Sequence, residues 1–366
     1  MNAPLRAWHA EPLPDDVRRA IDRLARSDDV RHVAVMPDVH LAEDVCIGAV
    51  VATERLIYPQ AVGGDIGCGM AAIRLESDAD VLRDEHAAAR VFRGLYRAVP
   101  ANRHAQAALP LDPGGLSEGR LRRMAERDGR VQFGTLGRGN HFLELQSDEH
   151  GQLWLMVHSG SRAMGPAIMR HHLEGAHSGP TGLLFLDAES DAGRAYLADA
   201  EWALTYADAS RRAMVDALAA VLEIDTDSAT YIHCRHNHVC RETHFDKSLY
   251  VHRKGAISAR DCEWGIIPGS MGTRSYHVQG RGCAGSLTSS SHGAGRAMSR
   301  SAARARITSV DFRRQMRGVW FDQRLTRELR EEAPSAYKDI TAVLRSEREL
   351  TRIVRTLRPI LSYKGV

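Results

Sequence analysis

The sequence predicts one domain of mixed α/β structure, and three observations lead to that prediction. The chain has 366 residues, of which 43% are hydrophobic, so it is long enough to bury a sizeable core. Amphipathic helical patterns alternate with short apolar runs that end at turns rich in Gly and Pro. The sequence contains no internal repeat, no low-complexity tract and no clear linker. We therefore expect a single domain over residues 1–366.

The first half of the chain is predicted to begin with a helix and to continue mainly as strands. Residues 15–27 have an amphipathic helical pattern, with Asp15 and Asp16 suited to its N-terminal end. A turn rich in glycine is expected at 62–69. Strand patterns occupy 33–38, 47–59, 70–77, 142–146 and 153–160, and helical patterns occupy 80–99 and 116–128.

The second half is predicted to be more helical. Residues 194–223 have a long helical pattern and are the best candidate for a helical subelement that protrudes from the domain. Residues 229–290 return to short strands and turns rich in Gly, Ser and His. From residue 292 onward we expect mainly helices, including one that begins just after His292 and a late one near 346–359.

Charge and cysteine usage narrow the class of protein. The net charge is +3 and the isoelectric point about 8.6, which permits a nucleic-acid partner without requiring one. None of the six cysteines forms a CxxC pair, and a chain of this length does not need disulfides. The sequence shows neither a signal peptide nor an apolar run that could span a membrane. These features predict a reduced cytoplasmic protein with no membrane partner and with thiols available as metal ligands.

Several short motifs combine into a mixed set of possible metal ligands. Asp65 and Cys68 flank a glycine-rich turn, His141 precedes an apolar strand, and His158 ends another strand. His236 belongs to a segment with three histidines in six residues, 233–238, where some of them could be bystanders. Each motif alone is more often structural than functional. Together they could bind two divalent metals that share a thiolate, with Mn²⁺, Zn²⁺ and Fe²⁺ all acceptable.

Other familiar motifs are absent. The segment GTLGRGNHF (134–142) resembles a phosphate-binding loop but lacks the GK[ST] of a Walker motif. The histidines of 233–238 have no CxxC partner, which argues against a zinc finger. His292 lies among small residues that leave room for a bulky ligand, but no GxSxG elbow accompanies it, which argues against a serine hydrolase.

Considered together, these sequence motifs resemble the signatures of the RtcB family of RNA ligases. The matching segments follow the family's order and span nearly the whole chain: MPDVH (36–40), DIGCG (65–69), GTLGRGNHFLELQ (134–146), HSGSR (158–162), HNH (236–238), LYVHRKGA (249–256), IPGSMGTRSY (267–276), SSHGAGRAMSR (290–300), EAPSAYKDI (332–340) and LRPILSYKG (357–365). The resemblance implies an α+β fold, with a central mixed β-structure surrounded by helices and a deep site for two manganese ions.

The resemblance also implies a role for individual residues. Cys68 resembles the thiolate that bridges the two Mn²⁺ ions. Asp65 and His141 would complete the shell of one ion, and His158 and His236 that of the other. His292 matches the nucleophile that takes GMP from GTP. The nucleotide would contact residues that match the family's GTP-binding positions: Asn140, Glu144, Arg162, Ser270, Ser275, Ala294, Gly295, Tyr337 and Lys364.

The implied reaction joins RNA 3′-phosphate or 2′,3′-cyclic phosphate ends to 5′-hydroxyl ends, in RNA repair or tRNA splicing, with an archease-like protein as a possible activator. The chain is shorter than typical members and departs from the family pattern at 41–49 and 60–71, as expected of a divergent paralogue. Two alternatives remain open from the sequence. One is a metal-dependent RNA phosphoesterase, and the other is a nucleotide-binding paralogue that no longer ligates.

Overall fold

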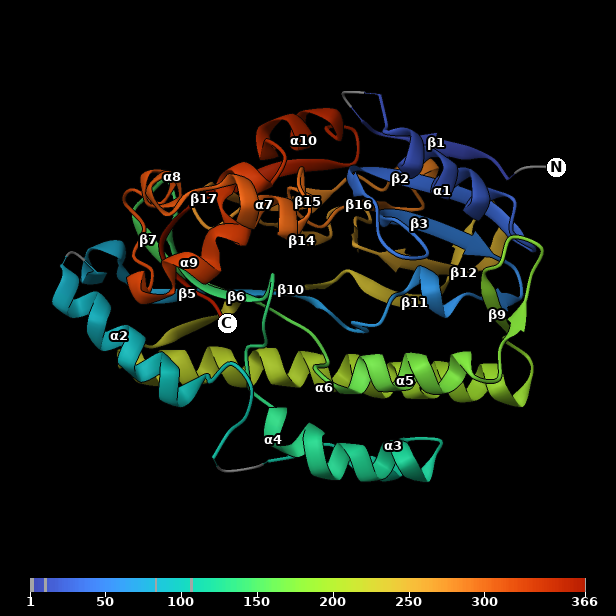
Figure 1. Ribbon diagram of the computed structural model, residues 1–366, viewed down its shortest axis with the longest axis horizontal. Helices are drawn as coiled ribbons and strands as arrows, with labels where there is room; N and C mark the ends of the chain where they lie inside the picture. Colours follow the sequence, from blue (N-terminus) through green and yellow to red (C-terminus); the bar gives the residue numbers. More distant parts are fainter. Residues whose placement is uncertain (1–2, 10–11, 83, 106–107, 366) are drawn as a thin grey trace.

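The protein has a mixed α+β architecture, seen in a computed structural model that describes residues 3–9, 12–82, 84–105 and 108–365. The β-sheets form the middle of the molecule, and helices cover them on both sides (Figure 1). In Figure 1 the long helix α6 (Asp191–Leu222) runs beneath the sheets and α10 (Ile340–Ser346) lies above them, while α7 (Arg300–Arg306) is level with their upper strands. Within the described ranges, no helix combines the length and apolar character needed to cross a membrane.

The larger sheet has seven strands in the order β10-β5-β7-β6-β17-β15-β14, and all neighbouring pairs are antiparallel. Leu143 and Leu145 of β6 pack with α2 (Glu85–Ala98) and α6, whereas Phe142 packs on the opposite face with α10. Because successive side chains of a strand point to opposite faces, Glu144 lies on the face of Phe142. The strands are β5 (Gly69–Asp78), β6 (Phe142–Ser147), β7 (Gln152–Ser159), β10 (Thr226–Arg235), β14 (Trp264–Ile267), β15 (Ser275–Gly280) and β17 (Thr351–Tyr363).

A second sheet has five strands in the order β1-β2-β3-β12-β11, and α1 (Asp15–Ala25) packs on it. Its strands are β1 (Leu5–Ala7), β2 (Val30–His40), β3 (Ile47–Thr53), β11 (Asn237–His244) and β12 (Lys247–Lys254). Strand β10 of the first sheet ends at Arg235 and β11 of the second begins at Asn237. A single residue, His236, therefore connects the two large sheets.

Smaller elements complete the fold. They are β13 (Ala256–Ser258) paired with β16 (Ser289–Ser291), a sheet of β4 (Leu56–Ile57), β9 (Leu184–Asp187) and β8 (His177–Ser178), and the helices α3 (Gly119–Met124), α4 (Arg130–Gln132), α5 (Met164–Leu173), α8 (Ser309–Gln315) and α9 (Thr326–Leu329). The predicted helices at 15–27, 80–99 and 116–128 correspond to α1, α2 and the segment from α3 to α4. The predicted strands correspond to β2, β3, β5, β6 and β7.

Three expectations about the second half were wrong. Helix α6 does not protrude: Tyr196, Tyr206 and Met214 are fully buried, and the helix packs against β5 and β7. No helix begins just after His292, because the next helix is α7, which starts at Arg300. The late helix near 346–359 is largely strand β17, which pairs with β15 and β6. Its β-branched residues suit a strand, and Pro359 lies at a register shift.

Candidate active site

The five predicted metal ligands converge where the two large sheets meet. Asp65 lies in the turn before β5 and Cys68 immediately precedes that strand. His141 precedes β6, His158 lies near the end of β7, and His236 joins β10 to β11. The backbone N–H of His236 donates to the carbonyl oxygen of Cys68 at 2.9 Å, which ties the junction between the sheets to the turn. We call these five residues the Cys68 cluster.

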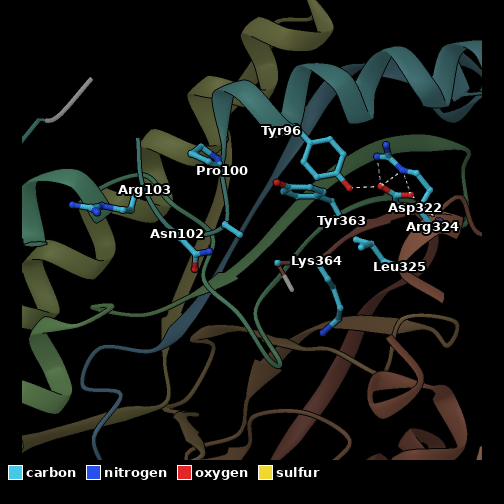
Figure 2. A pocket seen from close by; sticks show the side chains of 11 residues that line it. Tyr96, Pro100, Asn102, Arg103, Asp322, Arg324, Leu325, Tyr363 and Lys364 are labelled. Carbon is cyan, nitrogen blue, oxygen red and sulfur yellow. Dashed lines mark hydrogen bonds and ion pairs between the residues drawn. The ribbon is translucent and has the colours of Figure 1, made fainter. Parts of the chain in front are cut away.

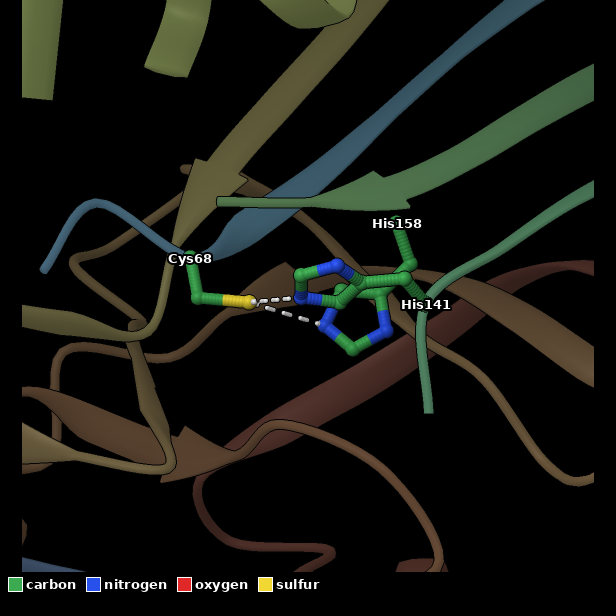
Figure 3. Close-up of side chains that lie close together, drawn as sticks. All are labelled: Cys68, His141 and His158. Carbon is green, nitrogen blue, oxygen red and sulfur yellow. Dashed lines mark hydrogen bonds between the residues drawn. The ribbon is translucent and has the colours of Figure 1, made fainter. Parts of the chain in front are cut away.

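The donor atoms of the cluster face one another. The Sγ of Cys68 lies 3.2 Å from Nε2 of His158 and 3.4 Å from Nε2 of His141 (Figure 3). The Nε2 of His141 lies 3.0 Å from Oδ2 of Asp65, and the Nε2 of His158 lies 3.4 Å from Nε2 of His236. One sulfur, three imidazole nitrogens and one carboxylate oxygen thus gather in one small volume.

Backbone carbonyls set the orientation of two of the imidazoles. Nδ1 of His141 lies 3.1 Å from the carbonyl oxygen of Leu136, and Nδ1 of His158 lies 3.1 Å from that of Asn140. A carbonyl only accepts, so each Nδ1 carries a proton and Nε2 of His158 presents a lone pair to the cluster. Nε2 of His141 faces the Asp65 carboxylate and donates to it, and it would present its lone pair once a cation takes the place of that proton. A cation would satisfy the lone pairs of His141 and His158, together with the sulfur and the carboxylate.

The electrostatics of the cluster also fit a bound cation. Burial and the charge of Asp65 raise the pKa of the Cys68 thiol well above its usual value. Burial raises the pKa of Asp65, but the hydrogen bond and charge of His141 outweigh it and bring the pKa to about 2. Burial, followed by neighbouring imidazoles, lowers the pKa of His158 and of His236. A carboxylate, the neutral imidazoles of His158 and His236 and a thiol that ionises beside a cation form a donor set that suits a divalent metal.

The glycines of the motifs make room for the ligands. A Cβ at Gly137, whose φ is +99°, would lie 2.3 Å from Nδ1 of His141. A Cβ at Gly160 would lie 2.2 Å from Oδ1 of Asp65. Larger side chains would therefore displace two of the metal-ligand candidates, and the glycines of GTLGRGNHF serve close packing here.

His292 lies beside the Cys68 cluster and is held by a buried carboxylate. It follows β16, and its ring centroid lies 4.8 Å from that of His236. Its Nδ1 lies 2.6 Å from Oδ2 of Asp38, and its backbone N–H donates to the same oxygen at 3.2 Å. Asp38 comes from β2 and is fully buried. Since Nδ1 donates to the carboxylate, Nε2 keeps the lone pair that a nucleophile needs.

A cavity opens next to His292 and His158, and most of the predicted nucleotide contacts line it. These are Asn140, Glu144, Ser270, Ser275, Ala294, Gly295, Tyr337 and Lys364. Arg162 is the exception, because it does not line this cavity. Its Nε donates to Oγ1 of Thr135 and its Nη2 to the carbonyl oxygen of Ala101, both at 3.3 Å.

The cavity contains two carboxylates in different environments. Glu144 accepts hydrogen bonds from Gln146 Nε2 at 2.8 Å and Ser362 Oγ at 3.0 Å, and burial raises its pKa to about 7. Glu332 accepts from Lys364 Nζ at 2.8 Å and from the Tyr337 hydroxyl at 2.6 Å. Burial raises the pKa of Glu332, but Lys364 outweighs it and leaves the pKa below its usual value.

The sequence prediction missed Asp38 and Glu332. A signal for Asp38 existed, since it is a single acid within the apolar strand VAVMPDV and therefore needs a partner. Glu332 follows another glutamate, and nothing in the local pattern distinguishes the buried one from its neighbour. Arg296 and Arg300 also line the cavity, and no role for them was predicted from the sequence.

Comparison with known proteins agrees with the resemblance. The family described as tRNA-splicing ligase RtcB matches residues 21–118 and 113–365. The RNA-splicing ligase RtcB of Escherichia coli K12 is 36% identical, over 100% of this chain and 98% of that protein. The RNA-splicing ligase RtcB of Mycobacterium tuberculosis H37Rv is 30% identical over 92% of this chain and 97% of its own length. The tRNA-splicing ligase RtcB of Nanoarchaeum equitans is 28% identical over 100% and 96%.

Proposed function

The chain belongs to the RtcB family of RNA ligases, and we propose that it joins RNA 3′-phosphate or 2′,3′-cyclic phosphate ends to 5′-hydroxyl ends through GMP carried on His292. One observation carries the proposal. His292 lies between the Cys68 cluster and the adjacent cavity, with Nδ1 on Asp38 and Nε2 available as a nucleophile.

In the first step, Nε2 of His292 attacks the α-phosphorus of GTP. A nitrogen–phosphorus bond forms, the bond to the β-phosphate oxygen breaks, and pyrophosphate leaves. Asp38 holds the Nδ1 proton and stabilises the positive charge that develops on the ring, as the buried aspartate does in a catalytic triad.

In the second step, an oxygen of the RNA 3′-phosphate attacks the same phosphorus, and the bond to His292 breaks. A 2′,3′-cyclic phosphate must first be opened by water. The 5′-hydroxyl of the other strand then attacks the activated 3′-phosphate, GMP leaves, and a phosphodiester forms. When the nitrogen–phosphorus bond breaks, its electron pair returns to Nε2 of His292, while Asp38 keeps the proton on Nδ1.

The Cys68 cluster would hold two Mn²⁺ ions, and the Cys68 thiolate would contribute to binding them. Asp65 and His141 would bind one ion, and His158 and His236 the other. When bound, such ions neutralise phosphate charge and orient the reacting groups. The carbonyls behind His141 and His158 keep their Nε2 atoms aimed at the site.

The cavity would bind the guanosine. An ionised Glu144 can accept both the N1–H and the exocyclic amine of guanine, which would select GTP over ATP. Ser275, Tyr337 and Lys364 lie around the same cavity and would complete the guanine contacts, and Ser270, Ala294 and Gly295 would line the nucleotide. We propose that Asn140 and Arg162 act near the phosphates, and Arg162 would have to release Thr135 or Ala101 to do so.

Covalent labelling tests this proposal. The wild type, His292→Ala and a control, His233→Ala at an exposed histidine, are incubated with Mn²⁺ and GTP labelled at the α-phosphate. We expect an acid-labile label on the wild type and the control, and none on His292→Ala. Absence of label on the wild type, together with opening of cyclic phosphate ends, would favour the phosphoesterase instead. Absence of both activities would favour a binding protein.

We further propose that residues 1–366 act as one catalytic domain in the cytoplasm, in RNA repair or tRNA splicing. An archease-like activator belongs to the same proposal. Assays with and without such a protein would show whether guanylylation depends on it.

A further inference from the structure

A second cleft borders the guanosine cavity at the C-terminal end of the chain, where Lys364 lines both. Its volume is about 540 Å³. It is bounded by Tyr96 near the end of α2, by residues 100–103, by Asp322, Arg324 and Leu325, and by the end of β17 with the two residues that follow it (Figure 2). This volume falls within the roughly 300–1,000 Å³ of small-molecule sites. We call it the Tyr96 cleft. Of the residues with a proposed catalytic, metal-binding or nucleotide-binding role, Lys364 alone lines it.

Aromatic rings form one wall of the Tyr96 cleft. The rings of Tyr96 and Tyr363 meet edge to face, with centroids 5.4 Å apart and planes at 84°. Tyr363 is buried, and its hydroxyl donates to the carbonyl oxygen of Val99 at 2.9 Å, which fixes its ring. Tyr96 is 37% exposed, so part of its ring faces the solvent. An exposed ring on a fixed support is a platform on which a nucleobase can stack.

The charge of the cleft is positive. The Cζ of Arg324 lies 5.8 Å from the centroid of the Tyr96 ring. Arg324 also forms an ion pair with Asp322, so the charges of Arg324 and Asp322 offset each other. Arg103, on the opposite side of the cleft in Figure 2, is exposed and forms no ion pair or hydrogen bond with any described residue. An uncompensated guanidinium across from an aromatic platform suits a phosphate group that is attached to a stacked base.

The cleft adjoins the candidate active site. Lys364 lines both the Tyr96 cleft and the guanosine cavity. The carbonyl oxygens of Pro100 and Ala101, in the wall of the cleft, accept from the backbone N–H groups of Leu136 and Gly137 at 3.0 and 2.9 Å. That loop leads directly to Asn140 and to the metal-ligand candidate His141. A chain seated in the cleft therefore borders the loop that helps to form the metal cluster.

We propose that the Tyr96 cleft binds a nucleotide of the RNA strand near the reacting end, with its base on Tyr96 and its phosphate at Arg103. The inference rests on the proposed ligase function, because it assigns part of the RNA path to this site. Stacking and one charge contact do not read base identity, so the subsite accepts any base. This suits a ligase that joins ends of different sequence.

Photo-crosslinking tests the position directly. RNA strands with 4-thiouridine at successive positions from the 3′-phosphate, or from the 5′-hydroxyl, are irradiated with the enzyme, and cross-linked peptides are mapped. We expect one position to label the segment 96–103, and the label to be lost in Tyr96→Leu. Cross-links confined to other segments would overturn the proposal. Loss of the cross-link on adding free AMP would do so too, since a free nucleotide would then be the occupant.

Ligation kinetics give a second test. Tyr96→Leu should raise the KM for RNA roughly tenfold because it removes the stacking surface, and Arg103→Ala should raise it by a smaller factor. Tyr96→Phe keeps the ring and should stay close to the wild type. Arg123→Ala, at an exposed arginine of α3, is the matched charge control. An unchanged KM for RNA in Tyr96→Leu would contradict the proposal.

Measuring self-guanylylation without RNA distinguishes a failure of the RNA subsite from a failure of the proposed ligase function. Tyr96 does not line the guanosine cavity, so Tyr96→Leu should take up GMP like the wild type. If the wild type forms no GMP adduct, the ligase proposal fails, while the cross-linking result still decides whether RNA occupies the cleft.

Discussion

Among the described residues, two largely buried clusters contain a cysteine, histidines and a carboxylate, and of these two only one has the properties of a metal site. The Cys68 cluster lies at the junction of the two large sheets, beside a cavity. The other lies on β11 and β12 and is centred on Arg253. We call it the Arg253 cluster, and its members are His238, Cys240, Glu242, His244 and Arg253.

The Arg253 cluster already contains its own cation. Nη1 and Nη2 of Arg253 donate to the two oxygens of Glu242 at 2.7 and 3.1 Å, and Nη1 also lies 3.6 Å from the Cys240 sulfur. Burial raises the pKa of Glu242, but hydrogen bonds from His244 and Arg253 and the Arg253 charge hold it well below its usual value. A guanidinium thus occupies the place that a metal ion would take.

The difference shows that residue types alone do not identify a metal site. The Cys68 cluster has no arginine among its members, and the Nε2 atoms of His141 and His158 face the sulfur. The Arg253 cluster instead connects strands: Arg253 Nε donates to Ser289 Oγ at 2.9 Å and Nη2 to the carbonyl oxygen of Leu287 at 3.1 Å. It therefore fixes the chain that leads through β16 to His292.

The largest expected effect is the loss of stability on removing Arg253, the cation within the Arg253 cluster. Arg253→Met removes the buried guanidinium that binds both oxygens of Glu242 and leaves only His244 and Arg260 as its charged neighbours, so the free energy of unfolding should fall by about 3–5 kcal/mol. Urea unfolding followed by circular dichroism measures this change. Arg241→Met, at an exposed arginine of the same strand pair, should stay within about 0.5 kcal/mol of the wild type. A loss below about 1 kcal/mol in Arg253→Met would show that Arg253 does not hold its cluster together.

The next effect concerns the orientation of His292. Asp38→Asn keeps the size of the side chain but removes the charge that holds the Nδ1 proton, so the rate of self-guanylylation should fall roughly 100-fold, about 2.7 kcal/mol. Single-turnover labelling with GTP measures this rate. Manganese binding should be unchanged, because Asp38 is not a member of the Cys68 cluster. A rate equal to that of the wild type would remove Asp38 from the mechanism.

The smallest effect is a pH dependence of GTP binding. The pKa of Glu144 is about 7, and guanine requires the ionised form. The Kd for GTP should therefore fall roughly tenfold as the pH rises from 6 to 8, with proton release on binding. Glu144→Gln should bind weakly and lose this component of the pH dependence. Titration calorimetry in two buffers of different ionisation enthalpy measures both quantities, and the same pH dependence in Glu144→Gln would exclude Glu144 as its source.

Local sequence patterns predicted many of the helices and strands. They failed for elements whose structure depends on pairing or packing with segments far away in the sequence. The amphipathic pattern of 15–27 was sufficient for α1, and the apolar runs were sufficient for β5, β6 and β7. Strand β17 was taken for a helix because its partners, β15 and β6, lie far away in the sequence. Likewise, the surface on which α6 packs is formed by β5 and β7, so its own sequence did not indicate whether it protrudes.

The motifs identified the candidate ligands, but they did not show which histidine belongs to which cluster. His236 and His238 are two residues apart, yet His236 joins the Cys68 cluster and His238 the Arg253 cluster. Regular alternation would place both on one face of a strand. The chain passes from one sheet to the other at His236, and no local pattern marks that break. The Asp38–His292 contact joins residues 254 positions apart and also depends on the tertiary fold.

Manganese binding to cysteine variants tests the central claim most directly. Equilibrium dialysis with Mn²⁺ compares the wild type, Cys68→Ser and Cys240→Ser, with circular dichroism to confirm folding. We predict that Cys68→Ser loses bound manganese, whereas Cys240→Ser binds as much as the wild type because Arg253 already neutralises its cluster. Equal binding by Cys68→Ser and the wild type would contradict the account.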